Sequence, residues 1–322
     1  MKKLISSVVM SAFCLTVHAN DNSGEYPTKP VRVVVGFTPG GPTDVVGRAF
    51  ANFVGKHAGK DFIVENKPGA NSTIATRYVS QAKPDGYTLL GAATNHTMIP
   101  ILYGDKVQFD VVKSFTPICT FAKSPTVLVT GPSVKANSLS ELLDEVKKEP
   151  GKFTAANSGV GSSVHIATAL FEKIANIKVN HVPFNGSSAS VNALMGGQVD
   201  MSFATLGSVL PQISSDRLKI LAVASSARLK ALPNVPTFEE QGIKGYSADA
   251  WYGFLAPAGT PDSAVKTLEG YVKDYQSDAE SQKTLAIQGL EPDATCGADF
   301  AAQIRNEVET YGKLAKDIGL TQ

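Results

Sequence analysis

The sequence is poor in the residues that mark several large classes of protein. Its 322 residues include 3 cysteines and 1 tryptophan, and 30 lysines and arginines balance 29 aspartates and glutamates. A formal net charge of +1 disfavours nucleic acid or a charged membrane surface as a partner. The low cysteine count argues against a small scaffold held by disulfides. A hydrophobic content of 43% is ample for a core, and for two lobes.

Long uncharged stretches are also scarce, and the notable one lies at the N-terminus. Lys2 and Lys3 precede an uncharged stretch over residues 4–17, and small residues flank a cut after Ala19. This arrangement is typical of a secretory signal peptide. A membrane-spanning helix needs about 20 apolar residues, so the stretch is too short for an anchor. We expect residues 1–19 to be a cleaved signal peptide and the mature protein to be periplasmic.

Cleavage at this position leaves two cysteines, Cys119 and Cys296. In an oxidising compartment they could form one disulfide. They could equally be two small buried hydrophobic residues. The sequence leaves both possibilities open.

Strand-like and helix-like segments alternate along the chain, which is typical of an α/β protein with mainly parallel sheets. Segments with 3.6-residue periodicity, such as residues 139–146 and 167–174, predict helices between the strands. Two more helices are expected between Pro261 and Leu320. Strands are predicted at residues 31–35, 62–64, 87–90, 126–129, 153–156, 179–183, 199–203 and 218–223.

Two segments share the order strand, glycine-rich turn, helix. The first, "VRVVVGFTPGGPTD" at residues 31–44, follows the phosphate-loop pattern until the lysine, where the chain has Pro42 and then Thr43. Backbone amides, a helix N-terminus and hydroxyls remain, and these suit a carboxylate better than a triphosphate. A tight turn without a ligand is the alternative. The second segment, "NSGVGSSVH" at residues 157–165, favours a ligand, because open α/β sheets bind ligands at this edge.

Enzyme signatures are missing. The sequence has no G-x-S-x-G motif, and Ser162 and His165 lie three residues apart without a nearby acid to orient the histidine. "GVGSSV" lacks the closing glycine of a dinucleotide fingerprint, which Val164 replaces. The histidines show no metal-binding spacing. We therefore expect no catalysis, cofactor or metal, with a secreted hydrolase as the disfavoured alternative.

A resemblance to a known family rests on many motifs in order. "YPTKPVRVVVGFTPGGPTD", "VENKPGA", "KPDGYTLL", "NSGVGSSVH", "HVPFNGSS", "LMGGQVDMSF" and "WYGFLAPAGTP" resemble the substrate-binding proteins of tripartite tricarboxylate transporters, the Bug-type family. The resemblance runs from Tyr26 to the C-terminus. It implies a periplasmic, monomeric, two-lobed clamp of Venus-flytrap type that captures a small organic carboxylate and passes it to a membrane permease. A clamp that presents its ligand to a membrane histidine kinase is the other reading.

The resemblance also implies which residues contact the ligand, with Asp44 holding the first loop rather than touching an anion. Two segments depart from the common family pattern, Asn71-Ser72-Thr73 and Ala204-Thr205. Ala204 removes a negative group that could pair with a ligand ammonium, so an amino acid is disfavoured. The expected ligand-binding residues are Phe37, Thr38, Pro39, Gly40, Gly41, Thr43, Asn71, Ser72, Asn95, Ser158, Ser162, Ser163, His165, Asn185, Gly186, Ser187, Ala204 and Thr205.

The resemblance finally predicts the layout of the clamp. One lobe should comprise residues 26–121 and 247–322, and the other residues 122–246, with crossings near "FTPI" and "SADAWYG". A dicarboxylate is the favoured ligand, including aromatic acids of the phthalate type. Phe37, together with His96 or Trp251, would supply flat apolar walls.

Overall fold

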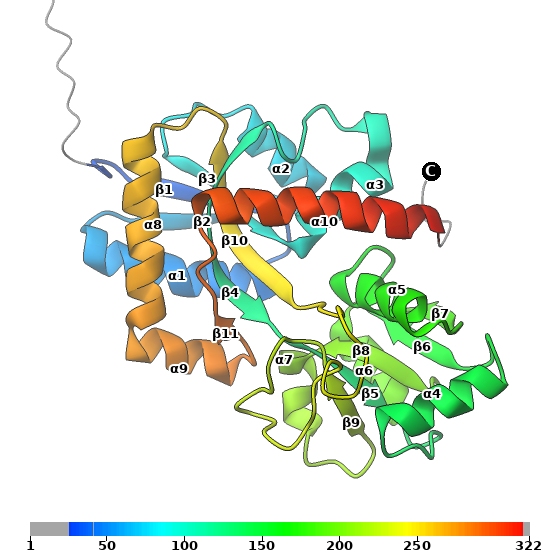
Figure 1. The fold of residues 1–322 in the computed structure, drawn as a ribbon. Coiled ribbons are helices and arrows are strands. Elements are labelled where there is room, and N and C mark those ends of the chain that lie inside the picture. Colours follow the sequence, from blue (N-terminus) through cyan, green and yellow to red (C-terminus); the bar gives the residue numbers. More distant parts are fainter. Residues whose placement is uncertain (1–25, 41, 318–322) are drawn as a thin grey trace, which may run out of the picture.

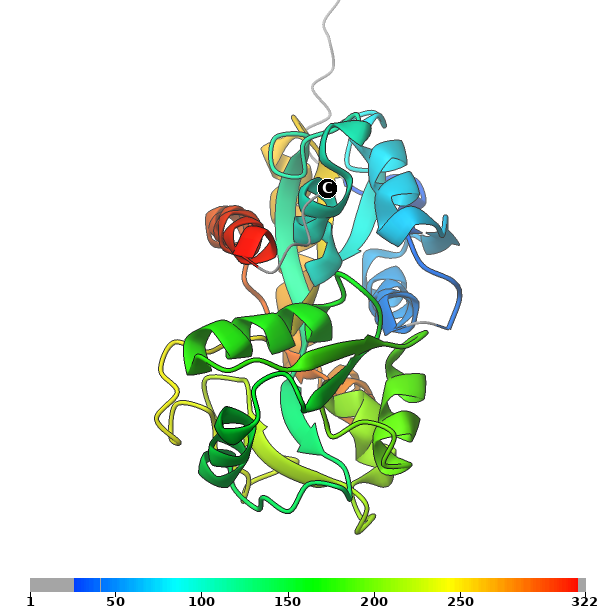
Figure 2. The same ribbon diagram turned by 90° about the vertical axis from the view of Figure 1, so that its right-hand side faces the viewer.

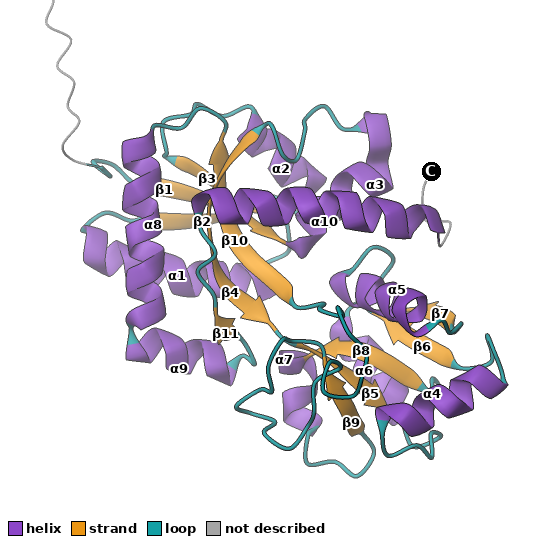
Figure 3. Cartoon of the chain, viewed as in Figure 1, coloured by secondary structure: helices purple, strands orange, loops and turns teal. Residues whose placement is uncertain are grey.

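The computed structural model describes residues 26–40 and 42–317. The expected signal peptide lies outside these residues. Two α/β lobes, each built around its own sheet, lie next to one another (Figure 1), as the sequence predicted. Helices flank both sheets (Figure 3). Within the described part of the chain, no helix is both long and apolar enough to cross a bilayer.

The first lobe contains a six-stranded sheet with the order β11-β4-β10-β3-β1-β2. Three strands, β2, β1 and β3, run parallel. All four valines of β1 are buried, and they contribute to cores on both faces of the sheet, as expected of a central parallel strand. The strands are β1 (Val31–Val35), β2 (Phe62–Asn66), β3 (Thr88–Ala93), β4 (Phe115–Ser124), β10 (Ala250–Pro257) and β11 (Glu291–Pro292).

The second lobe contains a five-stranded sheet with the order β7-β6-β8-β5-β9. Here β7, β6 and β8 are parallel, and β5 runs antiparallel to both β8 and β9. The helix α5 (Ser163–Ala175) packs its apolar face on this sheet around Phe171 and Phe203. The strands are β5 (Thr126–Thr130), β6 (Thr154–Asn157), β7 (Asn180–Pro183), β8 (Met201–Thr205) and β9 (Lys219–Val223).

The antiparallel strands β5 and β10 follow from the way the chain passes between lobes. The chain enters each of these strands from the other lobe, at the edge where the parallel strands end. Accordingly, Thr126 at the start of β5 pairs with Thr205 at the end of β8. Likewise Tyr252, near the start of β10, pairs with Ala93 at the end of β3. The two strands β4 and β10, which carry the chain to and from the second lobe, were missing from the sequence-based strand list.

The helices follow the strands as an α/β fold requires. The C-terminal region holds three helices rather than the two expected, because Asp278 adopts an extended conformation and its side chain accepts a hydrogen bond from Ser281 N, which starts α9. The α-helices are α1 (Pro42–Ala58), α2 (Thr73–Ser80), α3 (Ile99–Tyr103), α4 (Leu139–Lys148), α5 (Ser163–Ala175), α6 (Ser187–Met195), α7 (Leu206–Val209), α8 (Asp262–Ser277), α9 (Ala279–Ile287) and α10 (Gly297–Asp317). The 3-10 turns are η1 (Ala70–Ser72), η2 (Thr94–Met98), η3 (Gly104–Lys106) and η4 (Leu210–Gln212).

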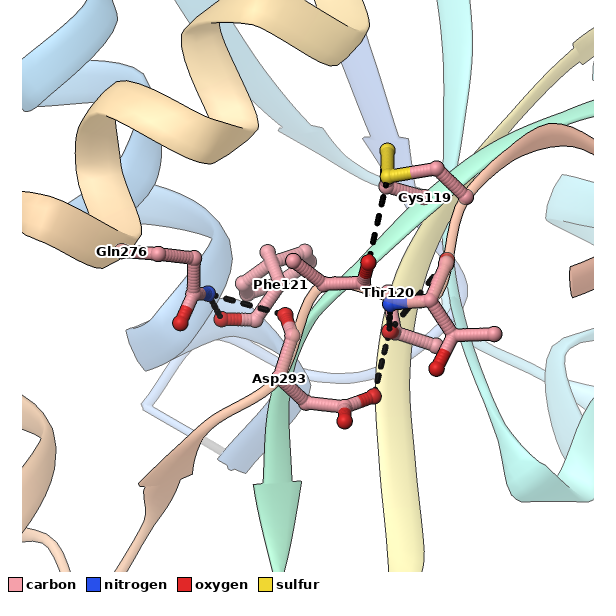
Figure 4. Close-up of a disulfide and its surroundings, with 8 residues drawn as sticks. Cys119, Thr120, Phe121, Gln276 and Asp293 are labelled. Atoms are coloured by element: carbon pink, nitrogen blue, oxygen red, sulfur yellow. Dashed lines mark hydrogen bonds between the residues drawn. A yellow bond between two sulfur atoms is a disulfide. The ribbon is translucent and has the colours of Figure 1, made fainter.

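The two cysteines left open by the sequence form a disulfide. Cys119 in β4 is bonded to Cys296, just before α10, with Cα atoms 4.0 Å apart (Figure 4). Around it, Thr120 Oγ1 donates to the Asp293 carboxylate and accepts from Thr295 N at 2.9 Å. The bridge therefore fastens the C-terminal helix to the strand that leads into the second lobe.

Candidate ligand-binding cleft

The edge where the parallel strands end in each lobe faces the other lobe (Figure 2). A helix begins within a short turn of most of these strands, so several helix N-termini face the same space. In the first lobe α1 follows β1 and η2 follows β3, and in the second lobe α5 follows β6 and α6 follows β7. The first amides of a helix have no partner within the helix and carry a partial positive charge. The cleft is therefore suited to an anion.

A cavity of about 400 Å³ occupies this space between the lobes. Its walls come from the turns after β1, β2, β3, β6, β7 and β8, and from the start of β10. The lining residues that the structure describes include hydroxyl and amide side chains and two aromatic rings, but no charged side chain. They are Phe37, Thr38, Pro42, Thr43, Asn71, Ala93, Thr94, Asn95, Ser158, Gly159, Val160, Ser162, Ser163, Gly186, Ser187, Thr205, Ala250 and Tyr252.

The first-lobe loop, residues 37–43, is held by a buried carboxylate. Asp44 Oδ2 accepts from Gly40 N at 2.9 Å and from Arg48 Nε at 3.0 Å. Asn66 Nδ2 donates to Asp44 Oδ1 at 2.8 Å and to Phe37 O at 3.0 Å. Burial alone would raise the pKa of Asp44, but the hydrogen bonds from Arg48, Gly40 and Asn66 outweigh it and lower that pKa. Asp44 thus supports the loop, as the sequence predicted, and does not line the cavity.

The second-lobe loop, residues 158–162, is held by neutral groups. Asn157 Oδ1 accepts from Gly159 N at 3.0 Å, and His165 Nδ1 accepts from Gly161 N at 3.0 Å. Ser162 caps α5, because its Oγ accepts from the backbone N of His165 at 3.3 Å. Gly161 has φ +76° and lies so close to Leu102 of the first lobe that a Cβ would be 2.6 Å from that side chain. The loop therefore needs glycine at this position.

A third part of the wall comes from the turn after β2. Asn71 adopts φ 52° and ψ 46°, a left-handed conformation that asparagine tolerates better than most residues. Its backbone O accepts from Asn95 Nδ2 at 3.0 Å. Its own Nδ2 is buried and has no hydrogen-bond partner. Since buried donors are nearly always satisfied in folded proteins, this amide is free to donate to a ligand in the cavity.

Many of the residues predicted from the sequence are brought together around this cavity. They are Phe37, Thr38, Thr43, Asn71, Asn95, Ser158, Ser162, Ser163, Gly186, Ser187 and Thr205. They come from both lobes and from separate turns that lie up to about 168 positions apart in the sequence.

Other predicted residues do not line it. Ala204 is packed in the core of the second lobe and is 3% exposed. Ser72 is buried against Gly36, where a Cβ would meet its Oγ at 1.9 Å. His165 lies behind the second-lobe loop, which it supports through Gly161.

Three further predicted residues that the structure describes are also absent from the lining of this cavity. Pro39 and Asn185 are exposed and are not among the lining residues. Gly40 lines a neighbouring cavity. Gly41 lies outside the described residues.

The aromatic wall differs from the expectation. His96 is buried, with Nε2 2.9 Å from Val111 O. Trp251 faces away, because its Nε1 donates to the Glu307 carboxylate at 2.9–3.0 Å and its ring packs on Phe300. Tyr252, the next residue of β10, lines the cavity instead. Successive side chains of a strand point to opposite faces. Trp251 and Tyr252 could therefore have been predicted to face opposite ways only if their segment had been assigned as a strand.

A second cavity of about 330 Å³ adjoins the first. The two share Pro42, Ser187, Thr205 and Tyr252. The second cavity also draws on Ser188, Gly207, Ser208, Gln288 and Leu290, among other residues, and its described lining likewise carries no charge. Beside it the lobes touch, since a Cβ on Gly207 would lie 2.3 Å from Gln288 O.

A comparison with known families identifies the chain. A family model described as the tripartite tricarboxylate transporter family receptor matches residues 46–320. The chain belongs to this family. A UPF0065 protein of Bordetella pertussis is 32% identical, with 98% of this chain and 96% of that protein covered. Like other members of the receptor family, the chain is a periplasmic-type solute-binding protein and not an enzyme.

Solved structures of relatives agree with the fold. R. palustris Rpa4515 with adipate is 28% identical, covers 92% of this chain and 99% of its own, and has a TM-score of 0.78. MatC of Rhodopseudomonas palustris with bound malate is 28% identical, covers 90% and 99%, and has a TM-score of 0.73. These similarities confirm the two-lobed α/β architecture and the family resemblance.

Proposed function

We propose that this receptor captures a small organic dicarboxylate in the cleft between its lobes and delivers it to the membrane subunits of a tripartite tricarboxylate-type transporter. The observation that carries the proposal is the chemistry of the cavity wall. It offers helix N-termini, hydroxyls and the unsatisfied Asn71 Nδ2, all of which donate hydrogen bonds, without a charged side chain among its described residues. Donors of this kind, without competing acids, suit a carboxylate.

The free energy available from such a wall is sufficient for useful affinity. Each helix N-terminus contributes about 0.3–1 kcal/mol to an anion at its end. Each hydrogen bond to a charged group adds about 1.5–3 kcal/mol. Three or four such bonds, less the cost of ordering both lobes, approach the roughly 8 kcal/mol that micromolar binding requires. An arginine is not needed in this sum.

The size and shape of the cleft favour a ligand with two ends. The main cavity and its neighbour of about 330 Å³ meet at Pro42, Ser187, Thr205 and Tyr252. One carboxylate in the main cavity would leave the second end pointing past Tyr252 toward the neighbouring cavity. Adipate and malate, the ligands of two relatives, are both dicarboxylates. The rings of Phe37 and Tyr252 keep an aromatic diacid of the phthalate type among the candidates.

Titration calorimetry on the mature protein tests the proposal. The ligand panel is malate, adipate, phthalate and terephthalate, with adipamide as a neutral partner of matched length for adipate. We expect micromolar binding of at least one diacid and at least about a hundredfold loss for the diamide where adipate binds, because the charge-assisted bonds are lost. Equal binding of diacid and diamide, or no binding of any diacid in the panel, would contradict the proposal.

Capture further requires that the lobes move about the two crossing segments. The predicted boundaries are residues 26–121 with 247–322 against residues 122–246, but "FTPI" lies inside β4 and pairs with β10, so the first crossing follows Ser124. Asp249 Oδ1 accepts from Thr126 N at 3.2 Å and from Ser225 Oγ at 2.7 Å, which ties one crossing to the other. Small-angle scattering with and without a bound diacid should show compaction. Identical curves would count against closure.

A further inference from the structure

The ligand-facing turn of the second lobe depends on a side chain that does not line the cavity. His165 occupies the first turn of α5 and is 5% exposed. Its Nδ1 accepts the hydrogen bond from Gly161 N at 3.0 Å. Because Nδ1 acts as an acceptor, it carries no proton, and the ring is neutral with its proton on Nε2. The hydrogen bond from Gly161 N thus sets the tautomer of His165, and through the same bond His165 holds the position of Gly161.

The surroundings of the ring favour this neutral form. The ring of His181 in β7 packs edge-on against it, with centroids 5.0 Å apart. His181 Nε2 in turn lies 2.6 Å from Glu172 Oε2 on α5. Among the described residues, His181 and Glu172 are the titratable groups that act on the charge of His165. Burial first, and His181 second, lower the pKa of His165 to about 4, although Glu172 opposes this shift.

Apart from its packing against Leu102, Gly161 is held in the loop by few other restraints. Asn157 holds the loop at Gly159, and Ser162 N donates to Gly159 O at 3.1 Å. Between these points lie Val160 and Gly161, and Val160 is an exposed residue of the cavity wall. The amide of Gly161 is buried with His165 as its partner. Without an acceptor there, a buried N–H would be left unpaired, and the turn would be expected to move.

We propose that His165 is a positioning residue for ligand binding: its neutral Nδ1 holds Gly161 and so keeps residues 158–162 in the shape that receives the ligand. The expected effect of His165 on affinity rests on the proposed function. Its expected effect on the conformation of residues 158–162 does not. It assigns His165 a role through the loop rather than contact with the ligand. Binding should therefore require an acceptor at this position, not an imidazole.

Two substitutions separate the acceptor from the ring. His165→Asn places a side-chain oxygen near the position of Nδ1, whereas His165→Leu fills a similar volume without an acceptor. We expect His165→Leu to weaken binding of the diacid by about tenfold or more, and His165→Asn to stay within about threefold of wild type. Val146→Ala is the matched control, because Val146 is a buried residue of α4 in the same lobe, away from the loop. It should lower stability without changing affinity.

A pH profile supplies a readout that a purely structural role would not give. Because burial lowers the pKa of His165 to about 4, protonation near that pH removes the acceptor. Wild-type affinity relative to His165→Asn should therefore fall about twofold near the midpoint and further below it. Titration of the ligand itself cancels in this ratio. Parallel profiles for the two proteins would overturn the proposal.

Amide hydrogen exchange at Gly161 tests the loop without any ligand. Exchange should accelerate in His165→Leu but not in His165→Asn, with Gly40 of the first-lobe loop as the internal reference. If no diacid binds the wild type, the proposed function fails while this measurement still decides the role of His165. If His165→Leu does not fold, the Asn variant and its pH profile decide. Wild-type exchange or affinity in a folded His165→Leu protein would overturn the inference.

Discussion

The two loops that face each other across the cleft have the same order of strand, turn and helix, but they are held by opposite chemistry. In the first lobe an ionised carboxylate, Asp44, collects hydrogen bonds from Gly40 and Arg48. In the second lobe a neutral imidazole, His165, accepts one bond from Gly161. The first support works only when it has lost its proton and is charged. The second works only when it has lost its proton and is neutral.

The comparison shows how a cleft without charged walls can still depend on charge. In the first lobe the charges lie behind the loop, where Asp44 pairs with Arg48 and accepts from Gly40 N, and the described cavity lining carries no charged side chain. In the second lobe the support behind the loop adds no charge. A bound carboxylate would therefore meet hydrogen-bond donors from both sides without competition from Asp44. The following predictions break one support at a time.

The largest expected effect is on stability at acid pH. Burial lowers the pKa of His165 to about 4, and burial, opposed by a hydrogen bond to Val111, also lowers that of His96 to about 4. In the unfolded chain these two imidazoles bind protons below about pH 6.5, whereas in the folded protein they bind them only near pH 4. The free energy of unfolding therefore falls as the pH falls through this window. Within this window each imidazole should lower the free energy of unfolding by about 1.4 kcal/mol for each unit that the pH falls. Urea unfolding from pH 7 to 4 measures the slope.

The His165→Asn variant is the control for this slope, which should be smaller in the variant by the contribution of one imidazole. Asp44 contributes in a different range. Because the pKa of Asp44 is lowered on folding, its ionised carboxylate stabilises the fold at any pH above the ordinary pKa of 3.8. That contribution is lost only as the pH falls below this value. The second-lobe loop should therefore open before the first on acidification. Simultaneous loss of Gly40 and Gly161 protection would contradict this order.

The next effect concerns the first-lobe support. Asp44→Ala removes the acceptor for Gly40, Arg48 and Asn66 at once. Arg48 is 46% exposed and can recover water, so the cost is moderated to about 2–3 kcal/mol of unfolding free energy. Affinity for the diacid should fall as well, because Gly40 N loses its acceptor and Asn66, which holds Phe37 O, loses one of its own partners. Urea unfolding at pH 7 is the measurement, and an unchanged midpoint would show that the network does not stabilise the loop.

Much of the fold was readable from the sequence because the strands are short, apolar and bounded by glycine or proline. The pattern at residues 31–35 matched β1, since a strand buried on both faces is rich in apolar residues, and here only Arg32 interrupts four buried valines. The sequence missed β4 and β10, whose runs contain Pro117 and Gly253 and read as turns. Gly253 is required there because a Cβ would meet Phe300 at 2.8 Å. Such close packing is a tertiary fact that local patterns do not report.

The site was predictable to the extent that glycine-rich turns at strand ends are visible. What the sequence could not supply is the direction in which each residue points. His165 and Ser162 are both on the second turn, yet Ser162 lines the cavity while His165 lies behind the loop. Ala204 and Thr205 are neighbours at the end of β8, and only Thr205 faces the cleft. A shift of one residue along a strand turns the side chain from the core toward the cleft.

The smallest effect compares two helix caps in the same lobe. Ser162 caps α5 at the cleft, and Ser138 caps α4 elsewhere in the lobe, accepting from Glu141 N at 3.2 Å. Replacing either serine by alanine should cost about 1 kcal/mol of stability, the usual contribution of a serine cap. Because Ser162 also lines the cavity, Ser162→Ala should in addition weaken diacid binding about tenfold, equivalent to about 1.4 kcal/mol. Calorimetry and urea unfolding on both variants separate the two contributions. If Ser138→Ala weakens binding as much as Ser162→Ala does, the effect is one of lobe stability, and Ser162 does not contact the ligand.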